Sequence, residues 1–332
     1  MKHWWKRAVY ACILCLCLCC TACSANSQPD PAVLLRETLS QVNALESCES
    51  RFSNDLEFNA GTEQQTFHSA VSSVYFADPF CLKSTQDTGA GAPSVTYTMT
   101  EDGFCWFYAE TEDGWLRTPA ETLNTTPSEQ IEILRLLKQA TDPQFVREEE
   151  VEGTPAYKLE VTFPADILRS SIEAIVSASG MGDGSQTLVQ ELLASTPAVY
   201  GYCYIGKDDG RLLRMELDTT EALNTVFSKI SGDSVKVSIS KSVLTGELFN
   251  CNAAAPVDSF KNGDICAGHA AGFVHHAQLA AGVQRKHGLD AQQAAGDGNR
   301  AGKAAALVQV FQRVHYRIQA QMGTGGLQIG YD

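Results

Sequence analysis

The sequence is poor in the residues on which most catalytic sites depend. Among residues 24–260 the only histidine is His68, and its alternate neighbours Ala70 and Val74 predict that it lies on a strand. The chain has no GxSxG, HExxH, Walker or dinucleotide-binding glycine motif. A Ser-His-Asp or Cys-His site would depend on His68 alone. We therefore expect a protein that is not an enzyme, with no cofactor and no metal site in this part.

Positive charge is also scarce. Residues 24–260 hold fifteen Lys and Arg against thirty-five Asp and Glu, a net charge of −20. Such a surface repels phosphates, and its few cations are not clustered, so we expect no nucleic-acid partner. The acidic run EEEVE, residues 148–152, would offer a glycosidase paired carboxylates, but a charge run beside a turn is typical of a solvated edge. An acidic binding face is the alternative to a merely solvated surface.

The C-terminal stretch lacks whole residue types. Residues 261–332 contain no Glu, Ser or Pro, yet hold five of the seven histidines and a net charge of +3. We expect residues 259–332 to be a discordant, poorly ordered tail. A frameshift or assembly error near residues 249–260 would explain it. The alternative is a cell-wall or metal-binding extension that uses His269, His275, His276 and His287.

What the sequence has in excess is cysteine near its start. Residues 12–23 contain six of the twelve cysteines. Lys2, Lys6 and Arg7 precede an uncharged, mostly apolar stretch that ends at Thr21, which is the order of a secretory signal. The stretch is too short to cross a bilayer as a mature helix. Its cysteines lie among apolar residues without companion ligands, so they act as apolar filler rather than a metal cluster.

Cys23 differs from the others because CCTAC followed by a polar linker resembles the lipobox of bacterial lipoproteins. Thr21 and Ala22 match the small positions, whereas Cys20 stands where a leucine is usual. The resemblance implies a signal peptide over residues 1–22, diacylglycerol on Cys23 and a lipidated linker over residues 23–29. The protein would then be held at the cell membrane, on its extracytoplasmic face. An ordinary cleavage after Ala25 is the alternative.

Residues 30–258 have the length of one domain. Asp30 and Pro31 predict the start of a helix, and Asp-Gly or Glu-Gly pairs between apolar runs predict tight hairpins. The pattern indicates an antiparallel sheet interrupted by helices. Strands are expected at 52–58, 67–76, 95–99, 104–108, 145–151 and 157–163, in a hairpin over 200–218, and in a closing pair of 235–240 with 242–249. Further helices are expected at 128–140, 167–176 and 188–193, with Ser128 capping the first.

Two segments resemble a known group of proteins, namely YCYIGKDDGRLLRMELDTTEAL and DSVKVSISKSVLTGELFN. Together with the N-terminal helix and the hairpins, they resemble uncharacterised, DUF6612-like lipoproteins of Gram-positive bacteria. Those families share the fold of the carriers LolA and LolB and of the mycobacterial LppX/LprG lipoproteins. The resemblance covers about residues 29–250. It implies an α+β fold in which a curved antiparallel half-barrel wraps around helices and leaves an apolar cavity.

Two functions follow from this resemblance. The first is a lipid-anchored extracytoplasmic protein that binds or carries a lipid or another apolar or amphiphilic small molecule. The second is a structural or interaction lipoprotein whose helices fill the half-barrel. Alternating aromatic residues on two strands are the candidate cavity lining, although core packing is the commoner role of such stripes. These candidates are Phe104, Trp106, Tyr108, Tyr200, Tyr202 and Tyr204.

Cysteines also remain in the exported part of the chain. An exported protein can pair its thiols, but the spacing of these residues does not give a connectivity. The residues concerned are Cys48, Cys81, Cys105, Cys203, Cys251 and Cys266.

Overall fold

A computed structural model describes residues 29–60, 63–87, 89, 92–111, 114–120, 126–178, 185–231, 237–257 and 265–266. The expected signal peptide, Cys23 and nearly all of the expected tail lie outside these residues. The strands are β1 Ser47–Ala60, β2 Glu63–Phe76, β3 Cys81–Asp87, β4 Ser94–Glu101, β5 Phe104–Thr111, β6 Gly114–Pro119, β7 Thr141–Val151, β8 Thr154–Phe163, β9 Val199–Gly206, β10 Leu212–Asp218, β11 Val237–Phe249 and β12 Ile265–Cys266. The helices are α2 Pro31–Asn43, α3 Pro127–Gln130, α4 Glu132–Leu137, a 3₁₀ turn Ala165–Leu168, α5 Arg169–Ala178, α6 Ser185–Ser195 and α7 Thr220–Ser231.

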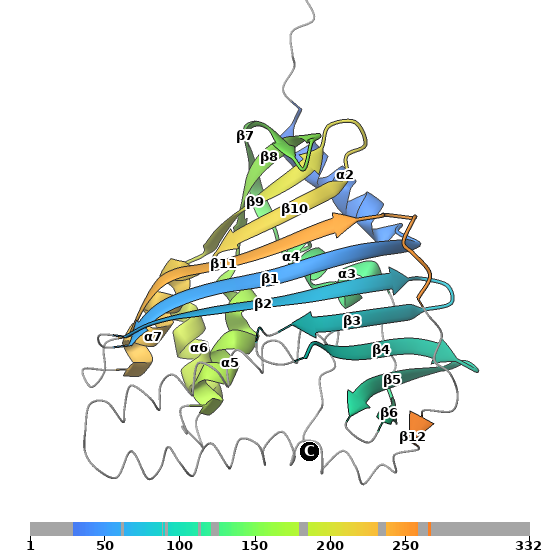
Figure 1. The fold of residues 1–332 in the computed structure, drawn as a ribbon. Helices are drawn as coiled ribbons and strands as arrows, with labels where there is room; N and C mark the ends of the chain where they lie inside the picture. Colours follow the sequence, from blue (N-terminus) through green and yellow to red (C-terminus); the bar gives the residue numbers. More distant parts are fainter. Residues whose placement is uncertain are drawn as a thin grey trace, which may run out of the picture.

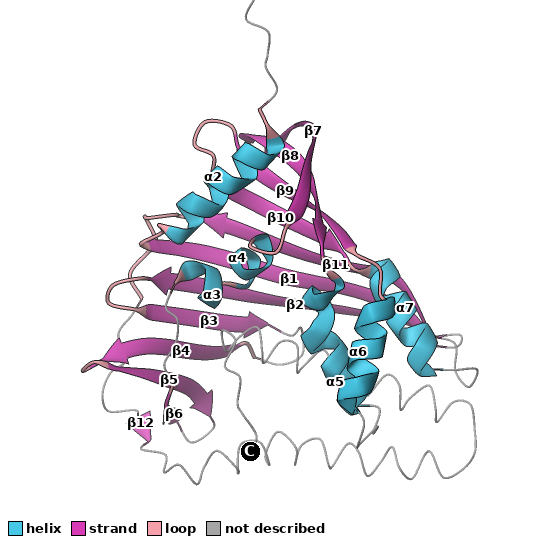
Figure 2. Cartoon of the chain, turned by 180° about the vertical axis from the view of Figure 1, so that it is seen from behind, coloured by secondary structure: helices cyan, strands magenta, loops and turns pink. Residues whose placement is uncertain are grey.

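The strands form one sheet in the order β12-β6-β5-β4-β3-β2-β1-β11-β10-β9-β8-β7. Strands β1 to β11 pair antiparallel throughout. The two-residue β12 differs, because it pairs parallel with β6 at Trp115 and Leu116. Figure 1 shows the twisted sheet, and Figure 2 shows the helices gathered on one of its faces. The predicted α+β fold, a curved antiparallel sheet around helices, is confirmed.

The hairpin turns are where the sequence predicts them. Asp102 and Gly103 have φ of 52° and 79°, and Glu152 and Gly153 have φ of 49° and 81°. Positive φ at two successive residues gives a turn whose twist matches that of the flanking strands. Gly210, with φ of 68°, closes the predicted hairpin between β9 and β10. Local turn chemistry therefore sets the pairing of neighbouring strands.

Helix α2 begins as expected. The Asp30 carboxylate accepts hydrogen bonds from the backbone N–H of Ala32 at 2.9 Å and of Val33 at 3.4 Å. These bonds satisfy two of the donors that the first turn leaves without a helical partner. At the middle of the helix, the buried Thr38 hydroxyl donates to the carbonyl of Gly210 at 2.9 Å. Helix α2 is thereby fixed to the turn between β9 and β10.

The helix predicted over residues 128–140 is shorter and broken. Ile131 is extended, with φ of −107° and ψ of 118°, and separates α3 from α4. The N-cap position is Thr126 rather than Ser128. Ile131 is buried in the main apolar cluster, and we attribute the break to the packing of this side chain, a tertiary effect that overrides local helix propensity.

The strand pair predicted at the end of the domain is a single strand. Residues 235–240 and 242–249 do not pair with each other, because β11 runs without a turn from Val237 to Phe249. The long neighbour β1 pairs with β11 from Phe249 to Val237, with one irregularity beside Glu57. The length of β11 therefore follows from its partner strand.

The helices pack on the sheet through side chains of the main apolar cluster. The main contacts of described helices with strands join α7 to β11, α2 to β7, and α4 to β1 and β11. Helices α5 and α6 pack chiefly against each other. Within the described ranges, none of these helices has the length and apolar character needed to cross a bilayer. The helices thus form a layer on one face of the sheet.

Candidate functional site

The two faces of the sheet have different chemistry. We call the face that carries the helices the inner face and the opposite face the outer face. On β9 and β10, Cys203 lies opposite Met215, and both are fully buried in the cluster beneath the helices. Successive side chains on a strand point to opposite faces, so Tyr202 and Tyr204 point outward. The face to which each side chain of the other strands points can be assigned in the same way from the strand pairing.

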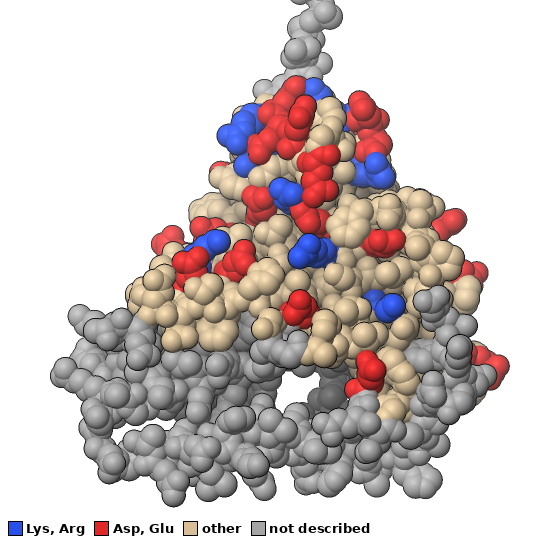
Figure 3. Space-filling view, in the orientation of Figure 1, with Lys and Arg blue, Asp and Glu red and all other residues tan. Residues whose placement is uncertain are grey.

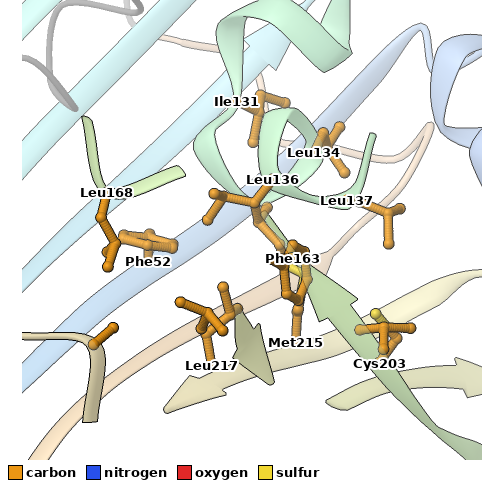
Figure 4. Close-up of a cluster of buried hydrophobic side chains, with 14 of the residues drawn as sticks. Phe52, Ile131, Leu134, Leu136, Leu137, Phe163, Leu168, Cys203, Met215 and Leu217 are labelled. Atoms are coloured by element: carbon orange, nitrogen blue, oxygen red, sulfur yellow. The ribbon is translucent and has the colours of Figure 1, made fainter. Parts of the chain in front are cut away.

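The inner face over β1 and β8–β11 is apolar and tightly covered. A Cβ atom added to Gly246 of β11 would lie 2.7–2.8 Å from three side-chain atoms of Ile133 on α4. Contacts that short do not occur between real side chains, so only glycine permits this approach of helix and strand. Leu134 and Leu137 of the same helix are also fully buried. Figure 4 shows the side chains of α4 pointing into a cluster with Phe163, Met215 and Leu217.

The inner face over β1–β6 is rich in hydroxyl groups instead. One row across the strands consists of Ser50, Ser73, Ser84, Thr96 and Ala109. The hydroxyl oxygens of Ser73 and Ser84 lie 3.2 Å apart, which confirms that the row shares one face. All of these residues are small, so the row forms a shallow, polar strip across the sheet.

The next row combines hydroxyls with larger apolar side chains. It contains Tyr75, Leu82, Thr98, Phe107 and Thr118 on β2 to β6. The Thr118 hydroxyl is buried and has no hydrogen-bond partner among the described residues. A buried polar atom without a partner is rare and needs an explanation such as a bound water or ligand. This half of the inner face is therefore amphiphilic in character.

A second such atom lies elsewhere on the inner face. The Asn54 side-chain oxygen on β1 is buried and also has no partner in the described part of the chain. Its strand neighbour across β2 is Ser69, which is buried as well. Asn54 and Thr118 are separated by several residues along the strands and by several strands, so they do not form one site.

The three candidate tyrosines of β9 lie on the outer face. Tyr200 is 61% exposed, whereas Tyr204 is buried. The ammonium group of Lys158 on β8 lies 4.2 Å from the ring centroid of Tyr202 and 4.9 Å from that of Tyr204. The Tyr204 hydroxyl donates to Glu216 at 2.9 Å. The tyrosines therefore pack with charged groups on the side of the sheet away from the helices.

The three aromatic candidates of β5 are placed in the same way. Cys105 packs against the inner cluster, so Phe104, Trp106 and Tyr108 point outward. The Arg117 guanidinium lies 3.7 Å from the ring centroid of Trp106. Phe104 is 67% exposed, at the end of the strand. A ligand on the inner face would contact the alternate residues of these strands, not the six aromatic candidates.

Tyr108 and Tyr204 occupy similar environments at opposite ends of the sheet. The Tyr108 hydroxyl donates to Glu101 at 2.7 Å, and Glu101 also pairs with Arg117 at 3.1 Å. Burial, and then the hydrogen bond to a carboxylate, raises the pKa of each phenol above its ordinary value. Both hydroxyls therefore stay protonated and act as donors. This is the chemistry of structural hydrogen bonds.

Charged side chains gather on the outer face over β7–β10. Figure 3 shows this concentration on the upper part of the molecule. Arg214 pairs with Glu247 at 2.7 Å, and Arg147 pairs with Glu149 at 2.7 Å. The hydrogen bond from Arg147 lowers the pKa of Glu149. Of the acidic run of residues 148–152, Glu148 and Glu149 on the edge strand β7 are therefore held in ion pairs.

His68 lies on the outer face and offers no catalytic arrangement. Its Nδ1 atom is 2.6 Å from the Asp55 carboxylate on the neighbouring strand, and both side chains are exposed. Lys241 is the next charged group, with its ammonium 3.9 Å from Asp55. The described residues also contain no group of three or more metal-ligating side chains.

Comparisons with known proteins give distant similarities in fold. No family model and no curated protein matches this chain. The lipoprotein LppX of Mycobacterium tuberculosis has a TM-score of 0.37 and 15% identity, over 69% of this chain and 100% of its own. LprF of Mycobacterium bovis has a TM-score of 0.37 and 12% identity, over 70% and 98%. A LolA superfamily protein of Nitrosomonas europaea has a TM-score of 0.22 and 9% identity, over 69% and 96%.

Proposed function

We propose that this chain is a lipid-anchored envelope protein that binds an apolar or amphiphilic molecule on the inner face of β2–β6. Diacylglycerol on Cys23 holds it to the extracytoplasmic face of the cell membrane. The support for the anchor is the sequence around Cys23, in which a short apolar stretch precedes small residues, a cysteine and a polar linker. Two acyl chains suffice for stable membrane attachment.

The observation that carries the binding proposal is the division of the inner face. Helix α4 packs directly on β1 and β11, whereas β2–β6 present rows in which hydroxyls alternate with apolar side chains. The buried, unpartnered hydroxyl of Thr118 belongs to one of these rows. A ligand with an apolar body and a few hydrogen-bonding groups would satisfy that hydroxyl and cover the half-buried Phe107. Ligand sites commonly combine apolar lining with a few polar groups in this way.

A second function is favoured by a different observation. The contact between Gly246 and Ile133 leaves no space between α4 and β11. A structural or interaction lipoprotein would need only this filled interior and an exposed surface for a protein partner. The outer-face pairs Arg147–Glu149 and Arg214–Glu247 would then be the surface to test first.

Mass spectrometry of the lipid-anchored protein distinguishes the two functions. The full chain is purified in mild detergent from the membranes of its own cells and extracted with organic solvent. Binding predicts one amphiphile per chain. The Ala109→Trp variant places a large ring on the inner row and should lose that amphiphile, whereas Glu110→Trp on the outer face should keep it. Repeated recovery of folded, ligand-free wild-type protein would favour the structural function.

The anchor is tested separately from the ligand. Cys23→Ser removes the sulfur that would be acylated. Wild-type protein should stay with the membrane after high-salt washing, and the variant should not acquire fatty acids. An unmodified mature N-terminus after Ala25 in the wild-type protein would contradict the lipoprotein assignment.

A further inference from the structure

Two cysteines far apart in the sequence come together where the domain closes. Cys48 is the second residue of β1, and Cys251 follows the last residue of β11 by two positions. Strands β1 and β11 are antiparallel, with Glu49 opposite Phe249. The start of β1 therefore lies beside the end of β11.

The backbone after β11 is held against the start of β1 by hydrogen bonds. The backbone N–H of Asn252 donates to the Ser47 carbonyl at 2.7 Å. The Asn252 side-chain oxygen accepts from the backbone N–H of Glu46 at 2.8 Å and of Ser47 at 3.4 Å. Asn250 and Asn252 both have positive φ, which asparagine tolerates better than most residues. Residue 251 is thus fixed between two anchored neighbours.

The two side chains are on the same side of the sheet. Cys48 is fully buried in the apolar cluster, and the partly buried Cys251 packs against that cluster. Burial, and then the nearby Cys251, raises the pKa of the Cys48 thiol. Both thiols therefore face the same apolar cluster, at the place where the backbone after β11 is bonded to the start of β1.

We propose that Cys48 and Cys251 form a disulfide bond in the exported protein. This inference rests on the extracytoplasmic location proposed above, where disulfides persist. The oxidant is an exported thiol–disulfide oxidoreductase in its disulfide form. The two thiols lose two protons and two electrons as the S–S bond forms, and the oxidant's disulfide is reduced to two thiols. The reaction precedes final burial, because a buried thiol with a raised pKa is a poor nucleophile.

Three other cysteines of the domain are placed less well for pairing. Cys81 lies on the outer face of β3, and Cys105 lies on the inner face of β5, so the sheet separates their side chains. Cys203 is buried on β9, where burial alone raises the pKa of its thiol, to about 12. The proposed bond would join the first strand to the end of the last long strand and close nearly the whole domain into one loop.

Peptide mapping tests the bond in the full chain. Protein purified from the membranes of exporting cells is treated with N-ethylmaleimide in denaturant without reductant, digested and analysed by mass spectrometry. The peptides that contain Cys48 and Cys251 should be linked, and Cys81, Cys105 and Cys203 should carry the label. Cys81→Ser is the matched control that should keep the link, and Cys251→Ser should leave Cys48 labelled.

A refolding experiment separates this inference from the proposed location. The full chain, reduced and unfolded, is refolded with a mixture of reduced and oxidised glutathione. The Cys48–Cys251 link should form there, and its reduction should lower the thermal midpoint by roughly 5–10 °C. A link in vitro but free thiols in cells would support the pairing and contradict export. Free thiols or a different pairing after refolding would overturn the proposal.

Discussion

The contact between Gly246 and Ile133 yields the sharpest prediction from this fold. In Gly246→Ala the new methyl group would meet Cδ1, Cβ and Cγ1 of Ile133 at 2.7–2.8 Å. Two of these atoms belong to the stiff start of a β-branched side chain, so rotation of a flexible end cannot relieve the clash. Helix α4 or strand β11 must move instead. Both lie in the buried cluster, where there is little free space.

The magnitude follows from two opposing effects. Forcing an extra carbon into a packed core costs about 1–3 kcal/mol, and clashes with three atoms place this site in the upper part of that range. Replacing glycine by alanine in a strand also stabilises the folded state by about 0.5–1 kcal/mol, because the unfolded chain has less conformational entropy to lose. We therefore expect Gly246→Ala to lower the free energy of unfolding by about 1–2.5 kcal/mol. The thermal midpoint should fall by roughly 2–10 °C.

A double-mutant cycle identifies the cause. Ile133→Ala removes two of the three clashing atoms and alone costs about 2–5 kcal/mol, because the side chain is fully buried. In the combined variant the two effects should be less than additive by about 1 kcal/mol or more, measured by urea unfolding. A neutral or stabilising Gly246→Ala, with no coupling to Ile133, would refute the packing of α4 on β11 and reopen this half of the interior to a ligand.

Two further predictions concern buried titratable and charged groups. Burial raises the pKa of the Cys203 thiol from 9.0 to about 12. The contribution of this protonated thiol to the free energy of unfolding is therefore complete below pH 9 and is lost as the pH rises toward 12. With reductant present, Cys203→Ala should reduce the slope of unfolding free energy against pH in this window by about 1.4 kcal/mol per unit, and equal slopes would contradict the assignment. The buried Lys158 lies over two tyrosine rings, so Lys158→Met should cost about 1–2 kcal/mol in thermal or urea unfolding. The exposed control Lys241→Met should change stability by less than about 0.5 kcal/mol, and similar effects of both substitutions would argue against the packing described for Lys158.

The local parts of the fold could be predicted from the sequence because their causes are local. Asp30 followed by Pro31 specifies the start of α2, and Asp102-Gly103 specifies a turn with positive φ. The break at Ile131 and the continuous strand β11 could not be predicted in this way. Both depend on partners distant in the sequence, namely the apolar cluster around Ile131 and the full length of β1.

The face on which an aromatic stripe lies depends on the pairing of its strand with the neighbouring strand. On β9, Tyr204 alternates with Cys203, and either residue type suits a protein interior. The partner strand resolves the choice, because Tyr204 lies opposite Arg214 and Cys203 lies opposite Met215. The register shifts between Leu212 and Arg214, so the turn at Asp209-Gly210 does not by itself fix this pairing. The alternation of charge with Met and Leu on β10 is thus the signal that places the tyrosines outside.

Because the aromatic stripes lie on the outer face, other residues should be tested for ligand binding. Large aromatic side chains on the outer face have neighbouring cations, as Trp106 has Arg117, and these contacts already account for their position. The Thr118 hydroxyl on the inner face has no comparable explanation, because it is buried without a hydrogen-bond partner among the described residues. Burial of hydroxyls without sufficient partners is unfavourable unless another molecule satisfies them. The row of β2–β6 that contains Thr118 is therefore the part of the inner face where a bound molecule would contribute most to stability.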